Sequence, residues 1–189
     1  MKQKPKYKPT RLSTPLGKAE WMHLNTAKKF EGDETAKYRG ELVLEQQAAN
    51  ALIEQIEPVY NEAYKAWCEQ IGKKAPRAQF PWEEGDGTIK FKFKVNEAWP
   101  DGTSRKPEVV DMDKKPISEN VGNESVVRIM FQPHFYSASA GFGMQLQPLK
   151  VQVKDLVVFS GGSSASLDFD DVSEPESKKT GTDDKDLDW

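Results

Sequence analysis

The segment from Gly87 to Val95 alternates apolar and polar side chains without a break, and it constrains the fold more than any other stretch. Apolar side chains occupy one side and lysines the other: Ile89, Phe91, Phe93 and Val95 against Lys90, Lys92 and Lys94. A period of two residues indicates a β-strand with one buried face. The lysine face has two interpretations, a solvated surface or a surface that binds a polyanion.

Other segments extend this pattern into a fold. Strand-like stretches cover 16–24, 37–45, 125–135 and 144–159, with a short candidate at 108–112. From Ala49 to Ile71 the apolar residues recur every three or four positions, which predicts an amphipathic helix that ends at Gly72. We therefore predict a mainly β protein: a five-stranded oligonucleotide-binding (OB) barrel with one long helix between strands 2 and 3, and disordered termini. A mixed α+β sandwich is the alternative.

Charge divides the 189-residue chain into a basic body and an acidic end. Nine acidic and three basic residues lie within 167–189, whereas residues 1–166 hold 24 basic and 21 acidic residues. We expect a basic N-terminal arm at 1–15, a DNA-binding OB domain at 16–160, and a Gly/Ser linker with an acidic tail at 161–189. Opposite charge at the two ends suggests a nucleic-acid partner.

Several classes of protein are disfavoured. No run of about 18 apolar residues is present, so we expect no membrane span. A single cysteine, Cys68, rules out an internal disulfide and fits a reducing compartment such as the cytoplasm. His23 and His134 lack the spacing of a metal site, and no phosphate-binding glycine loop occurs. We expect neither a metal, nor a cofactor, nor enzymatic activity.

The residues suited to binding are cations and aromatic rings. A protein that binds single strands without sequence preference needs cations that follow the phosphates and rings on which bases stack. The predicted cationic contacts are Lys37, Arg39, Lys90, Lys92, Lys94, Arg105, Lys106, Arg128, Lys150 and Lys154, which could share one curved surface. The rings outside clear core registers are Trp82, Trp99, Phe135, Tyr136 and Phe142.

The acidic tail carries a second prediction. It ends with Asp183, Asp184, Asp186, Asp188 and a terminal Trp189. An aromatic residue at an unfolded end suits a hydrophobic pocket on a partner, and the carboxylates would steer the tail to basic residues around that pocket. The same carboxylates could occupy the protein's own basic surface and compete with nucleic acid.

These features resemble the single-stranded DNA-binding proteins of T7-type bacteriophages. The resemblance rests on the opening Thr14-Pro-Leu-Gly-Lys-Ala19, the strand start Lys37-Tyr38-Arg39, the helix after the first hairpin, and the acidic tail with a final aromatic residue. It implies binding of replication and recombination intermediates, contacts of the tail with polymerase or helicase, a homodimer, and residence in the host bacterial cytoplasm.

The sequence thus predicts a non-sequence-specific single-stranded DNA-binding protein that acts in phage DNA replication, recombination and repair. An RNA-binding OB module, and a non-enzymatic protein-binding adaptor or virion component, are the alternatives.

Overall fold

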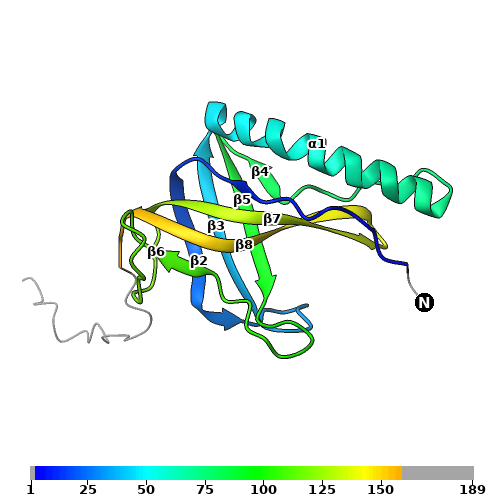
Figure 1. Ribbon diagram of the computed structural model, residues 1–189. Helices are drawn as coiled ribbons and strands as arrows, with labels where there is room; N and C mark the ends of the chain where they lie inside the picture. Colours follow the sequence, from blue (N-terminus) through cyan, green and yellow to red (C-terminus); the bar gives the residue numbers. More distant parts are fainter. Residues whose placement is uncertain (1–2, 159–189) are drawn as a thin grey trace, which may run out of the picture. The chain divides into compact units, whose positions relative to one another are not determined.

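The computed structural model describes residues 3–158, which form eight strands and one helix (Figure 1). Their bounds are β1 Leu12–Ser13, β2 Gly17–Lys28, β3 Lys37–Glu45, α1 Gln46–Ile71, β4 Trp82–Glu84, β5 Thr88–Asn96, β6 Glu108–Val110, β7 Val126–Ala138 and β8 Gly141–Asp155.

Five long strands pair in a closed ring. The pairing runs from β2 to β3, β5 and β8, continues to β7, and returns from β7 to β2. The β5–β8 pairing is parallel and the others are antiparallel. Short strands extend this ring: β1 pairs with β7, β4 with β5, and β6 with β8.

The structure has eight strands, whereas five were predicted. The five strands of nine or more residues match the predicted ones, and the helix falls between the second and third of these. Two of the additional strands, β1 and β4, have two and three residues, too few for alternation to be visible. The predicted ends also shift: β7 continues to Ala138 and β8 already begins at Gly141, so the two strands meet in a two-residue turn, Ser139–Ala140.

The β3–β5 ladder keeps one register along both strands. Nine residue pairs run from Lys37 opposite Asn96 to Glu45 opposite Thr88, with Gly40 opposite Phe93. The phenylalanines of β5 are buried while Lys92 and Lys94 are exposed. The alternation that predicted this strand therefore describes it correctly.

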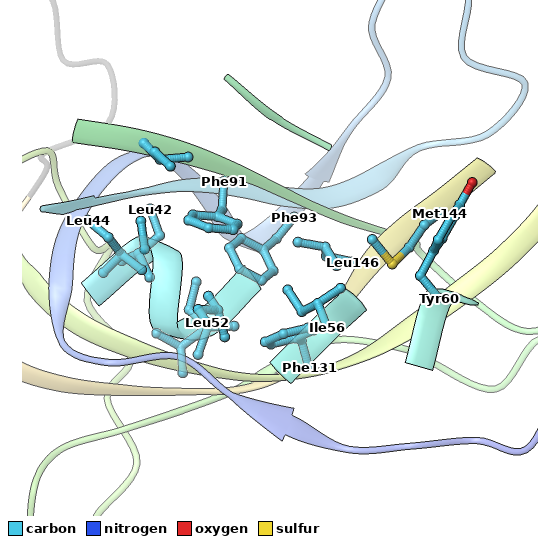
Figure 2. Close-up of a cluster of buried hydrophobic side chains, with 14 of the residues drawn as sticks. Leu42, Leu44, Leu52, Ile56, Tyr60, Phe91, Phe93, Phe131, Met144 and Leu146 are labelled. Carbon is cyan, nitrogen blue, oxygen red and sulfur yellow. The ribbon is translucent and has the colours of Figure 1, made fainter. Parts of the chain in front are cut away.

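Helix α1 closes the core from one side. It lies across one end of the long strands (Figure 1), and its buried Leu52 and Ile56 point toward Phe91 and Leu146 of the sheet, while Tyr60 lies beside Met144 (Figure 2). Gly72 ends the helix with φ of 68°, a left-handed conformation that glycine adopts without a Cβ clash. The predicted helix and its end are confirmed.

The N-terminal arm is packed rather than disordered over its described part, which corrects the prediction for residues 3–15. The Tyr7 ring meets the buried Phe135 edge-on at 4.8 Å between centroids, and the hydroxyl of buried Thr14 accepts from the Ile129 N–H at 2.9 Å. One aromatic and one hydroxyl side chain thus attach the arm to β7. The linker and acidic tail predicted for 161–189 lie outside the described residues.

None of the helical sequence within residues 3–158 is both long and apolar enough to cross a membrane.

Candidate nucleic-acid interface

Two adjoining hollows are lined by residues of β2, β3, β5, β7 and β8 and of the neighbouring loops. The first, here the Trp21 hollow, encloses about 490 Å³ and is lined by Trp21, His23, Phe30, Arg39, Gly40, Glu41, Gln79, Pro81, Lys92, Phe93, Lys94, Tyr136, Met144 and Gln145. The second, here the Trp99 hollow, encloses about 720 Å³ and is lined by Lys4, Tyr7, Thr35, Asn96, Glu97, Ala98, Trp99, Pro100, Arg105, Gln132, His134, Gln145 and Gln147. Gln145 lines both, so we refer to the two together as the groove.

Three exposed aromatic side chains mark the two hollows. Trp21 is 63% exposed, Trp99 52% and Phe30 48%. Large exposed rings gain little from folding, so their position favours contact with a ligand. Of these, only Trp99 was among the predicted rings. Trp21 and Phe30 were missed, although the break in alternation around residue 21 was a signal that could have found Trp21.

Arg39 lines the Trp21 hollow and is held there by Phe30 and Asp33. Its guanidinium carbon lies 4.1 Å from the centre of the Phe30 ring, and Nη2 is bonded to the Asp33 carboxylate. The buried Nε of Arg39 meets no acceptor within residues 3–158. Asp33 also accepts from Lys37 Nζ at 2.9 Å and from the Phe30 N–H at 3.0 Å. These bonds hold the pKa of the Asp33 carboxyl well below its usual range, and the bond from Lys37 has the largest effect.

The three lysines of β5 are not equivalent. Lys90 is paired with Glu20 at 2.5 Å and with Glu41 at 3.4 Å, and Lys92 is paired with Glu83 at 2.5 Å. Lys94 has no ion pair within the described chain. Partial desolvation lowers the pKa of Lys94, and the nearby Lys37 adds to this shift. A phosphate group would offset both effects, so Lys94 is the β5 lysine best placed to gain an anionic partner.

The Trp99 hollow combines a stacked cation with amide side chains. The Arg105 guanidinium carbon lies 3.8 Å from the centre of the Trp99 ring, and Nη2 donates to Gln147 Oε1 at 2.7 Å. His134 Nδ1 lies 2.5 Å from the Tyr7 hydroxyl. Burial lowers the pKa of His134, and the charges of Arg105 and Lys4 lower it further.

Other predicted contacts lie elsewhere. Arg128 and Lys150 line a separate hollow, where Arg128 Nε donates to Gln152 Oε1 at 2.7 Å and Lys150 pairs with Glu108 at 2.9 Å. Lys106 lines a further small hollow beside β6, and Lys154 is exposed near the end of β8. The expected single cationic surface is thus divided, because the cross-strand register places positions 128 and 150 in a hollow apart from the groove.

The predicted rings are divided in the same way. Tyr136 lines the Trp21 hollow, while Trp82 is partly buried and stacks on Phe80 at 4.7 Å between centroids. Phe135 is 2% exposed and Phe142 is fully buried, which corrects their assignment as surface rings. Both occupy inward positions of their strands and pack on Tyr60 of the helix.

Residues 3–158 contain no group of three or more His, Cys, Asp or Glu side chains placed to hold a metal ion. The groove offers exposed rings and cations, a combination typical of proteins that hold single-stranded nucleic acid, and amide side chains beside them.

A known family of phage proteins matches most of the chain. The family described as Enterobacter phage Enc34, ssDNA-binding protein, matches residues 11–180. The chain belongs to this family of phage single-stranded DNA-binding proteins. It is 26% identical over 155 residues to the single-stranded DNA-binding protein of Enterobacteria phage T3, covering 69% of this chain and 67% of that one.

Solved structures share the fold. The gp2.5 single-stranded DNA-binding protein of bacteriophage T7 superposes with a TM-score of 0.68 at 22% identity, covering 90% of this chain and 98% of that one. The Enc34 protein in complex with ssDNA superposes with a TM-score of 0.62 at 15% identity, covering 79% and 89%. The resemblance to the T7-type phage proteins is confirmed.

Proposed function

We propose that this protein binds single-stranded DNA without sequence preference along the groove formed by the Trp21 and Trp99 hollows. The observation that carries the proposal is that exposed rings and cations line the same face, with Trp21, Arg39 and Lys94 in one hollow and Trp99 and Arg105 in the next. Family membership supports it independently.

The rings favour single strands over duplex DNA. A base that stacks on an aromatic side chain contributes about 1–3 kcal/mol, and every base offers a flat face for this contact. In a duplex those faces are covered by neighbouring bases, so Trp21 and Trp99 would find no partner. The cations contact phosphate, which is identical at every nucleotide, and this explains why no sequence preference is expected.

We also infer that the closed β2–β3–β5–β8–β7 ladder is the OB barrel, with β1, β4 and β6 as additions. Its support is the ring of pairings and the fold shared with the T7 protein. OB folds bind oligonucleotides across their central strands, which corresponds to the position of the groove.

The wider role is proposed from the chain's charges and relatives. The protein would act in phage DNA replication, recombination and repair in the cytoplasm of the bacterial host, without enzymatic activity of its own and as a homodimer. Asp183, Asp184, Asp186, Asp188 and Trp189 would bind replication proteins such as polymerase or helicase, and would compete with DNA for the groove.

The test is a comparison of oligonucleotides by fluorescence anisotropy at several salt concentrations. We expect tight binding of a labelled thymidine oligomer, weaker binding of a duplex of equal length, and affinity that falls as salt rises because counterions are released. Tighter binding of the matched RNA oligomer would favour the RNA-binding alternative. Absence of binding to every oligonucleotide would contradict the proposal and favour a protein-binding adaptor.

A further inference from the structure

We infer that Trp21 is a base-stacking platform of the groove and that Asn123, from the turn before β7, is the residue that holds it in position. This inference rests on the proposed function and names two residues on which single-strand binding would depend. Its support comes from the backbone of β2, from one hydrogen bond, and from the exposure of the ring.

A β-bulge directs Trp21 outward. Glu20 pairs with Glu41 and His23 with Arg39, so β2 advances three residues while β3 advances two. One extra residue in a strand is a bulge, and it shifts which side chains face outward. In consequence Glu20 and Trp21 both face away from the core, while Met22 and Leu24 are buried.

The bulge places Trp21 in an uncommon backbone conformation. Its φ is 49°, in the left-handed region that a bulky side chain rarely adopts. Such strain persists only where the surroundings maintain it, and it concentrates at functional sites. Core packing does not account for it here, because the ring is 63% exposed.

Asn123 stabilises this conformation from a segment distant in sequence. Its Oδ1 accepts a hydrogen bond from the Trp21 N–H at 2.8 Å. The same turn is attached to β2 beside the bulge, because the Glu124 N–H donates to the Ala19 carbonyl at 2.9 Å and the Ala19 N–H donates to the Ser125 carbonyl at 2.8 Å. Asn123 is therefore held at a fixed position opposite the Trp21 backbone.

The surroundings of the Trp21 ring suit one nucleotide. Phe30 and Tyr136 line the same hollow, as do the cations Arg39 and Lys94. Flat apolar surfaces accept a base, and cations beside them accept its phosphate. A platform oriented by a strained backbone would need no rearrangement when DNA binds, which lowers the cost of binding.

The experiment measures affinity for two probes of equal length, a thymidine oligomer and an oligomer of abasic sites. We expect Trp21→Ala to weaken binding of the thymidine oligomer about 5- to 150-fold. Binding of the abasic oligomer should stay unchanged, because it offers phosphate but no base. Trp21→Phe, which keeps a smaller ring, should fall between wild type and Trp21→Ala, and it serves as the second variant should Trp21→Ala fail to fold.

A double-mutant cycle tests the role of Asn123. Asn123→Ala should weaken thymidine binding in the wild-type background and have no effect when Trp21 is already alanine. The matched control is Asn120→Ala, because Asn120 lies in the same loop but bonds Asn25 instead. This control should bind like wild type in both backgrounds.

Three outcomes would contradict the inference. Unchanged thymidine binding by Trp21→Ala and Trp21→Phe overturns the platform but leaves the proposed function intact. Equal losses from Asn123→Ala in both backgrounds overturn the positioning role. Wild-type protein that binds neither oligomer overturns the proposed function, and this inference with it.

Discussion

Arg39 shows at the scale of single residues how local pairing decides which cations reach a ligand. It lies on the Phe30 ring and shares the Asp33 carboxylate with Lys37, so two predicted DNA contacts are partly neutralised by one acid. The sequence predicted Arg39 and Lys37 as outward cations of one strand. It did not predict Asp33 as their partner, because a loop folds back onto β3 in a way that no periodic pattern encodes.

Replacing Asp33 with asparagine should strengthen binding of single-stranded DNA, most strongly at low salt, because Lys37 and Arg39 lose their anionic partner. Anisotropy titrations at low and high salt measure the effect. The control is Glu34→Gln, which removes an exposed acid that makes no ion pair within the described residues. Weaker binding by Asp33→Asn would mean that Asp33 serves to orient Arg39.

The same carboxylate predicts a pH dependence of stability. Because its pKa is lowered in the folded protein, Asp33 stabilises the fold above the unfolded value of about 4 and loses this contribution as the pH falls further. Urea unfolding at pH 7 and pH 3 should therefore show a smaller difference for Asp33→Asn than for wild type. An equal difference would show that the ion pairs of Asp33 do not contribute to stability.

His134 predicts a second pH effect near neutrality. Its folded pKa is lowered by burial, so the unfolded chain binds more protons and stability decreases as the pH falls below about 6.5. His134→Gln should reduce the difference in thermal midpoint between pH 7.5 and pH 5.5. No reduction would mean that another group causes the sensitivity.

At the scale of elements, regular strands were predictable and irregular ones were not. The Lys/Phe alternation of β5 survives in the structure because one face is core along the whole strand. Strand β2 alternates less regularly, since its bulge puts Glu20 and Trp21 on the same side and breaks the pattern there. Trp21, the most exposed ring of the groove, lies at this break.

Substitutions on the buried face of helix α1 should lower the stability of the fold without changing its affinity for DNA. Ile56 is fully buried beneath the sheet, and Ile56→Ala should lower the free energy of unfolding by about 2–5 kcal/mol. Affinity for single-stranded DNA should stay at the wild-type level under conditions where the variant is folded, because the groove is lined by strands and loops. Glu54→Ala on the exposed side of the helix is the control, with little change in either quantity. A loss of affinity by folded Ile56→Ala would show that the helix shapes the groove.

At the scale of the whole molecule, the division of charge predicts competition between the tail and DNA. Residues 1–166 carry a small excess of bases and residues 167–189 a larger excess of acids. Deletion of residues 168–189 should strengthen DNA binding, and the gain should shrink as salt rises, which anisotropy titrations can measure. Weaker binding by the truncated protein would contradict the competition.

Removing one arginine and one lysine, either from the groove or from the separate hollow, tests whether the groove holds the DNA. Arg39→Ala with Lys94→Ala changes the groove, while Arg128→Ala with Lys150→Ala changes the separate hollow, with the same loss of charge. We predict that the first pair weakens binding of a thymidine oligomer at least about tenfold and lowers the slope of log affinity against log salt by about 1.4, the value for two phosphate contacts on a single strand. The second pair should bind close to wild type. Equal losses in both variants would show that overall charge, and not the groove, holds the DNA.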